Sequence, residues 1–188
     1  MATTYEAEDL ARPGQEVALK LLAPEAAELA PWLRREYLTL RRVLHPCLLR
    51  VFDFGRFSEG SQERLFYTSE RVHGETLDRY ARGRSWDSVA PAVVDALEAL
   101  RFLHDMELLH GDLQPANVLV DHQGRATVVD LGCSRPFGAS SRPCGRPGFV
   151  APEVLAGGRA DGRADLFSVG ATLVALSRLL AAPCLLYT

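Results

Sequence analysis

The chain of 188 residues has only four cysteines, and none is placed for a metal site. Cys47, Cys133, Cys144 and Cys184 form no C-x-x-C pair, and no histidine stands at metal-ligand spacing from them. This excludes the usual zinc-binding patterns. We therefore expect reduced thiols in a cytoplasmic protein. Ordinary packing is the expected role of Cys133 and Cys144, and the alternative is that these two thiols beside the predicted site are sensitive to oxidation.

The chain also lacks a long hydrophobic run, a signal peptide and an excess of basic charge. Its most apolar tract, Val169 to Ala182, is interrupted by Arg178 and is too short to span a bilayer, so we interpret it as a buried helix. No basic segment followed by an apolar one opens the sequence. The net charge of −3 gives no reason to expect nucleic acid or an anionic membrane as a partner.

What remains is the composition of an ordinary globular domain, with 47% apolar and 24% charged residues. The first part of the chain is rich in strand patterns. Two strands are predicted within Thr3–Leu22, around a turn at Arg12–Gly14, and a helix is predicted over about Pro31–Val43. Two more strands are predicted over Leu48–Phe54 and Leu65–Glu70, with the polar loop Gly55–Glu63 between them.

The pattern changes after residues 72–74, where helical spacing takes over. Helices are predicted over Leu77–Ala81, with Thr76 as N-cap, over Asp87–Met106 and over Ala164–Leu180. The second of these helices has an apolar stripe formed by Val89, Val93, Leu97, Leu100 and Leu103. Between the second and third helices we expect a hairpin turn at Asp121–Gly124 and a loop over Cys133–Gly148. The sequence therefore predicts an α+β fold with a small β-rich N-terminal lobe, a hinge, and a mainly helical C-terminal lobe.

The most informative segment runs from His110 to Gly132 and reads HGDLQPANVLVDHQGRATVVDLG. Asp112 and Asn117 lie five residues apart on an irregular stretch, and Asp130 follows a short β-type run. Two hard oxygen ligands and a separate carboxylate base are what phosphoryl transfer from a nucleotide–Mg²⁺ complex requires. This pattern indicates phosphoryl-transfer chemistry.

Further motifs stand in a fixed order around this segment. Val17-Ala18-Leu19-Lys20 and Glu36 precede it, and Ala151-Pro152-Glu153 and Asp165 follow it. Together they resemble the catalytic domain of the eukaryotic-like, bacterial-type serine/threonine protein kinases over nearly the whole chain. The resemblance implies the two-lobe kinase fold, with an antiparallel N-terminal sheet and one αC-type helix.

The resemblance also implies a role for each matching residue in the use of ATP and Mg²⁺. Lys20 would hold the α- and β-phosphates and pair with Glu36, Asp112 would orient the acceptor hydroxyl and take its proton, and Asn117 and Asp130 would bind Mg²⁺. Asp165 would accept hydrogen bonds from the catalytic-loop backbone.

The adenine site follows from the same resemblance. Ser69 falls at the gatekeeper position, Glu70 and Val72 would offer backbone groups to adenine, and Ala18 and Leu119 would enclose the base. A small polar gatekeeper would leave a pocket open behind the adenine.

Three positions depart from the family pattern. Gly111 replaces the arginine that usually receives an activation-loop phosphate, so activation through Ser134, Ser140 or Ser141 is not expected. Gln114 replaces a lysine that neutralises the γ-phosphate, and Arg146 replaces a threonine. We expect the Arg146 side chain to supply the charge that Gln114 lacks; the alternative is that it caps the loop or pairs with Glu153.

Both ends differ from the family too. The glycine-rich loop would lie before Met1 and further C-lobe helices after the Asp165 helix, so we interpret residues 1–188 as one partial domain. Both an active and an inactive isolated chain fit this interpretation. It would comprise an N-lobe (1–70), a hinge (71–74), a partial C-lobe (75–183) and a translated sequencing artefact (184–188). The predicted function is transfer to serine or threonine of a protein substrate. The alternatives are a small-molecule phosphotransferase of the aminoglycoside or choline type and an inactive pseudokinase scaffold.

Overall fold

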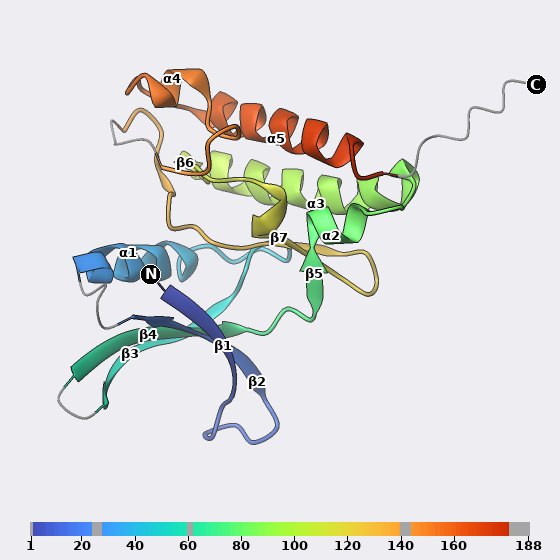
Figure 1. The fold of residues 1–188 in the computed structure, drawn as a ribbon. Coiled ribbons are helices and arrows are strands. Elements are labelled where there is room, and N and C mark those ends of the chain that lie inside the picture. Colours follow the sequence, from blue (N-terminus) through green and yellow to red (C-terminus); the bar gives the residue numbers. More distant parts are fainter. Residues whose placement is uncertain (1, 24–27, 60–61, 140–143, 181–188) are drawn as a thin grey trace, which may run out of the picture.

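The structure is a computed structural model that describes residues 2–23, 28–59, 62–139 and 144–180. The predictions for Ser140, Ser141, Cys184 and residues 184–188 lie outside this part. Figure 1 shows two halves, a sheet with one helix and a mainly helical half, connected through the chain near residues 71–73. The α+β prediction is thereby confirmed.

The N-terminal half is a four-stranded antiparallel sheet in the order β1-β2-β4-β3. Its strands are β1 (Ala2–Glu8), β2 (Glu16–Leu22), β3 (Val51–Glu59) and β4 (Gln62–Glu70). The predicted loop over Gly55–Glu63 is mostly wrong, because β3 and β4 continue into it. Gly55 lies directly on the Phe66 ring, and Phe57 packs against the same ring at 6.1 Å, so aromatic packing extends the hairpin.

The helix α1 (Ala30–Leu40) crosses the sheet and turns one face inward. Its buried residues are Leu33, Glu36, Tyr37 and Leu40. Tyr37 packs on Phe54 of β3 with ring centroids 5.1 Å apart. The helix ends at Leu40 rather than at the predicted Val43. Its inward face carries one charged residue, Glu36, into the space between the sheet and the other half.

The C-terminal half is built on two long helices that lie side by side (Figure 1). They are α3 (Trp86–Asp105) and α5 (Gly162–Ser177), accompanied by the short α2 (Leu77–Ala81) and α4 (Pro152–Leu155). The predicted stripe of α3 is buried except at Leu97, which is 37% exposed. Thr76 precedes α2 as predicted but makes no side-chain cap bond, whereas Ser85 caps α3.

Short strands connect the halves and shape the region of the predicted site. A three-stranded sheet has the order β5 (Gly74–Thr76), β7 (Val118–Asp121) and β8 (Ala126–Val128), and β6 (Leu108–Leu109) pairs with β9 (Arg135–Pro136). The predicted hairpin turn at Asp121–Gly124 is confirmed, because it connects β7 to β8. The predicted loop over Cys133–Gly148 contains the strand β9 near its start. Within the described part of the chain, no helix is long and apolar enough to cross a membrane.

Candidate active site

Lys20 and Glu36 form an ion pair between the sheet and α1. Lys20 Nζ donates to Glu36 Oε1 at 2.6 Å, which confirms the contact expected from the sequence. Tyr67 stands opposite Lys20 in the register of β2 and β4 and donates its hydroxyl to the same oxygen at 2.8 Å. Tyr67 was not among the predicted site residues, although strand alternation places it on the same face as Ser69.

Burial dominates the electrostatics of this pair. Glu36 is 4% exposed, and burial raises its pKa above the ordinary 4.5. The positive charge of Lys20 lowers this pKa, and the negative charge of Asp130 raises it, but burial has the largest effect. Burial is also the main cause that raises the pKa of Tyr67, and the negative charge of the neighbouring Glu36 adds to it. The hydroxyl of Tyr67 therefore stays protonated and remains a donor. The ionised pair therefore needs a pH above the raised pKa of Glu36.

Asp112 is held by donors on both carboxylate oxygens. Its Oδ1 accepts from Gln114 Nε2 at 3.0 Å and from the backbone N–H of Arg146 at 3.1 Å. Its Oδ2 accepts from Asn117 Nδ2 at 3.1 Å, and the same amide donates to the Asp112 carbonyl at 2.8 Å. Arg146 is exposed and reaches Asp112 through its backbone, so the charge expected from its side chain stays a prediction.

Asp165 connects α5 to the loop that carries Asp112, which we call the catalytic loop (residues 110–117). Its carboxylate is 1% exposed and accepts from the backbone N–H groups of His110 and Gly111, each at 2.9 Å. The ring of His104 on α3 lies 2.9 Å away. Burial raises the pKa of Asp165, but the hydrogen bond from His104, the neighbouring His110 and the loop N–H groups outweigh it and lower this pKa below 3.8. The loop contact predicted for Asp165 is confirmed.

Asp130 occupies a turn whose backbone is constrained. Its φ is +68°, a value that non-glycine residues seldom adopt. Asp130 Oδ1 accepts from the N–H of Gly132 at 3.1 Å and lies 3.8 Å from Lys20 Nζ. A Cβ on Gly132 would lie 3.0 Å from that oxygen, so the close approach of backbone and carboxylate suits glycine. The turn thereby fixes the direction of the Asp130 carboxylate.

A cavity of about 490 Å³ lies between the two halves and collects the predicted nucleotide residues. Its lining includes Ala18, Lys20, Ser69, Glu70, Val72, Asn117, Leu119 and Asp130. The N–H of Glu70 already donates to the Arg50 carbonyl at 2.9 Å, and the Ser69 hydroxyl donates to the Glu70 carbonyl at 3.2 Å. Both backbone groups of Glu70 thus have a partner within the chain, and the adenine contacts expected of Glu70 and Val72 stay predictions.

Cys133 and Cys144 are joined by a disulfide, with Cα atoms 5.7 Å apart. The expectation of reduced thiols is therefore wrong for this pair. Cys144 lies beside the turn after Asp130, a tertiary approach that no sequence spacing indicates. Cys47 is free and buried as expected, and burial raises its pKa. Cys184 lies outside the described residues.

Gly111 is the position where the family pattern has arginine, and the structure leaves no space there. Its φ is +81°, and a Cβ would lie 2.6 Å from the Cys133 carbonyl oxygen and 3.2 Å from Arg135 Nη1. Arg135 is itself 5% exposed, and burial lowers its pKa. The guanidinium of Arg135 thus lies next to the position where an arginine side chain on residue 111 would begin.

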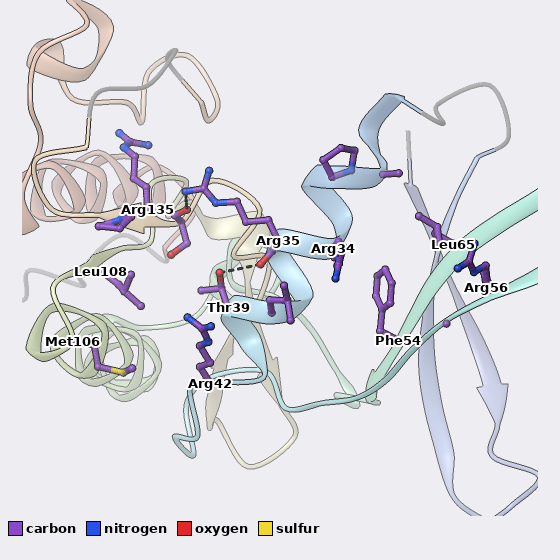
Figure 2. A pocket seen from close by; sticks show the side chains of 16 residues that line it. Arg34, Arg35, Thr39, Arg42, Phe54, Arg56, Leu65, Met106, Leu108 and Arg135 are labelled. Carbon is purple, nitrogen blue, oxygen red and sulfur yellow. Dashed lines mark hydrogen bonds between the residues drawn. The ribbon is translucent and has the colours of Figure 1, made fainter.

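A larger cavity of about 1230 Å³ lies on the other side of α1, away from the nucleotide residues. Figure 2 shows the arginines that line it: Arg34, Arg35, Arg42, Arg56 and Arg135. Arg35 donates to the Ser134 carbonyl at 3.1 Å. No carboxylate is among its lining residues. Arg56 is paired with Glu63 at 3.3 Å, so the positive charge of this surface comes mainly from the other arginines. This surface was not predicted from the sequence, because its arginines come from α1, the turn after α1, β3 and β9.

Comparisons with known proteins agree with this geometry. A family model described as "Protein kinase domain" matches residues 2–181. The chain is 37% identical over 187 residues to "CBL-interacting protein kinase 19" of Oryza sativa subsp. japonica, with 93% of this chain and 36% of that protein covered. It is 33% identical over 178 residues to "CBL-interacting serine/threonine-protein kinase 19" of Arabidopsis thaliana, with 88% and 36% covered.

A third relative, "CBL-interacting protein kinase 16" of Oryza sativa subsp. japonica, is 35% identical over 188 residues, with 93% of this chain and 40% of that protein covered. The chain thus spans 36 to 40% of the length of these three relatives. All three are plant proteins, which gives no support to the bacterial type. The kinase-like fold predicted from the sequence is confirmed, and the chain belongs to the protein kinase domain family.

Proposed function

We propose that the chain carries the catalytic residues for transfer of the γ-phosphoryl group of ATP to a serine or threonine hydroxyl of a protein. One observation carries the proposal. Lys20, Asn117 and Asp130 line the same cavity, and the amide of Asn117 binds Asp112 directly. An ammonium, two metal-type oxygen ligands and a carboxylate base are thereby brought to one place, as phosphoryl transfer requires.

The residues fit a nucleotide with Mg²⁺. Asn117 uses its Nδ2 on Asp112, so its carbonyl oxygen is left for a cation, and the Asp130 side chain is 45% exposed beside it. Two protein oxygens suffice, because Mg²⁺ usually takes its other ligands from phosphates and water. Among the described residues no group of three or more acidic, histidine or cysteine side chains competes for a metal. Bound Mg²⁺ would neutralise charge on the phosphates.

Asp112 is the proposed base. Two donors already occupy Oδ1, whereas Oδ2 has one donor, Asn117, among the described residues. An acceptor hydroxyl is therefore expected to donate to Oδ2, which orients its oxygen and takes its proton. Lys20, held by Glu36 and Tyr67, would fix the α- and β-phosphates.

The protein acceptor rests on a separate argument. The Arabidopsis relative is named a serine/threonine-protein kinase, and Ala151-Pro152-Glu153 begins α4 directly after the segment that contacts Asp112. We propose the same acceptor class for this chain. The bacterial type, the partial-domain interpretation and the cytoplasmic location remain predictions, and the adjoining genomic sequence tests the first two.

Transfer from labelled ATP tests the proposal. The full chain with Mg²⁺ should label a generic protein substrate, and Asp112→Asn should lower the rate by a factor of roughly 10² to 10⁴. Chelation of Mg²⁺ should abolish the transfer. Equal rates with Asp112→Asn would contradict the proposed base. Label on choline or an aminoglycoside, but not on protein, would favour the small-molecule enzyme, and ATP binding without transfer would favour the scaffold.

A further inference from the structure

The disulfide joins two turns that each lie on a carboxylate of the proposed site. Cys133 directly follows Gly132, whose backbone approaches Asp130 so closely that a Cβ would lie 3.0 Å from Asp130 Oδ1. The same turn is fixed by the hydrogen bond from the N–H of Gly132 to that oxygen. One end of the disulfide is therefore anchored on a rigid part of the nucleotide cavity.

The other end belongs to the turn that touches Asp112. Cys144 precedes Gly145, whose φ is +109° and where a Cβ would lie 3.0 Å from Asp112 Oδ1. The next residue, Arg146, donates its N–H to the same oxygen at 3.1 Å. This turn contacts Asp112 through its backbone, so its position decides whether Oδ1 keeps that donor.

Little else holds this turn in place. Among described residues, the hydrogen bonds of residues 144–148 are the one from Arg146 to Asp112 and one from the N–H of Phe149 to the Arg146 carbonyl. Position 111 has no room for the arginine that the family pattern places there, because a Cβ would lie 2.6 Å from the Cys133 carbonyl oxygen. The disulfide is thus the strongest connection between this turn and the rest of the site.

We propose that Cys133 and Cys144 are a redox modification site that fastens the 144–148 turn onto Asp112. Both residues are half-buried, so a small thiol or disulfide can reach them. In oxidation, the two thiols give two electrons and two protons to a low-molecular-weight disulfide, which leaves as two thiols while the Cys133–Cys144 bond forms. Reduction reverses these steps and releases the turn. The effect on phosphoryl transfer rests on the proposed function; the change in the turn does not.

The first experiment tests the bond in the full chain. After denaturation without reductant and blocking of free thiols, chymotrypsin cleaves after Phe137, between the two cysteines. Mass spectrometry should find the two flanking peptides linked, and dithiothreitol should separate them. Unlinked, blocked peptides from protein treated with oxidised glutathione would overturn the proposal.

The second experiment measures amide hydrogen exchange of the turn. Exchange at Arg146 should be about tenfold faster after reduction, because local opening then costs less free energy. Cys133→Ser and Cys144→Ser should show the fast rate with or without dithiothreitol. The control Cys47→Ala, which removes a buried free thiol, should still respond to reduction. An exchange rate that is the same in oxidised and reduced wild type would overturn the proposal.

A third measurement separates this inference from the proposed function. Reduction should raise the KM for the protein acceptor several-fold while the Kd for ATP stays unchanged, because the turn lies at Asp112 and outside the nucleotide cavity. A redox-dependent exchange rate without any phosphoryl transfer would overturn the function and leave the switch. A redox-dependent Kd for ATP with an unchanged KM would overturn the assignment of the switch to the acceptor side.

Discussion

At the scale of single residues, the site depends on atoms that serve more than one partner. Glu36 Oε1 accepts from both Lys20 and Tyr67, and Asp112 Oδ1 accepts from Gln114 and Arg146. Such shared acceptors are sensitive to the loss of one donor, because the remaining charge stays buried with fewer hydrogen bonds.

Tyr67→Phe tests the shared acceptor at Glu36. The buried carboxylate would lose one of its two donors, so we expect a free energy of unfolding lower by about 1.5 to 3 kcal/mol. Urea denaturation measures the change. Tyr5→Phe is the matched control, because Tyr5 is 48% exposed and its hydroxyl has no hydrogen bond to a described residue. Equal stabilities of the two variants would contradict the role given to Tyr67.

Gly111→Ala tests why this position has no side chain. A Cβ would lie 2.6 Å from the Cys133 carbonyl in addition to the strain of a positive φ, so we expect a loss of about 3 kcal/mol. Gly83→Ala is the control, since Gly83 has a φ of +68° and nothing within 4 Å of an added Cβ, and should lose about 1 kcal/mol. Thermal unfolding compares them; a smaller loss at Gly111 than at Gly83 would be inconsistent with the crowding.

At the scale of elements, the catalytic loop is positioned by a helix that follows it by more than fifty residues. Asp165 in the first turn of α5 binds the N–H groups of His110 and Gly111 and the ring of His104 on α3. The carboxylate of Asp165 thus connects the start of α5 to α3 and to the loop that carries Asp112. The fold around Asp112 therefore depends on the ionised form of Asp165.

The pH dependence of stability tests this fastening. The pKa of Asp165 is lower in the folded chain than the ordinary 3.8, so ionised Asp165 stabilises the folded form fully above about pH 5, and this contribution is lost as the pH falls through 3.8 toward the lower folded value. Asp165→Asn should cost about 3 kcal/mol at pH 7 and much less at low pH. Urea unfolding from pH 7 to 3 measures this difference.

The exposed Asp105 provides the comparison, since Asp105→Asn removes a carboxylate that is 69% exposed on the same pair of helices. Its stability difference from wild type should stay small throughout the pH range. A difference for Asp165→Asn that does not shrink toward pH 3 would show that this carboxylate acts through packing alone.

At the scale of the whole molecule, α5 leaves apolar side chains in solvent. Leu166 is 54% exposed and Val174 58%, and both lie on one face because they are eight positions apart on the helix. A contiguous exposed apolar surface favours association.

Leu166→Gln together with Val174→Gln tests this surface. The double variant should bind the dye ANS less strongly and stay monomeric to a higher concentration than wild type, as measured by fluorescence and light scattering. Leu10→Gln is the control, because Leu10 is 88% exposed but lies in the β1–β2 turn, away from this face. Equal dye binding in the double variant and wild type would argue against an exposed apolar surface on α5 that promotes association.

Much of the fold was predictable because local patterns decide it. Strand alternation predicted β2, and helical spacing predicted α2 to the residue and α3 within one residue at each end. The length of the β3–β4 hairpin was not predictable, since the packing of Gly55 and Phe57 on Phe66 decides it. The family resemblance also implied the pairing of Lys20 with Glu36. It did not indicate Tyr67, which a neighbouring strand supplies.

The sequence by itself determined the membership of the protein kinase domain family and predicted which residues would carry the chemistry, because both depend on residue types in a fixed order. Only the tertiary structure decided how they are held. Cys133 and Cys144 approach each other only once the segment after β9 folds back, and Gly111 is closed off by the Cys133 carbonyl. Such contacts join residues through space, and their energies depend on distances and burial that the order of residues does not contain.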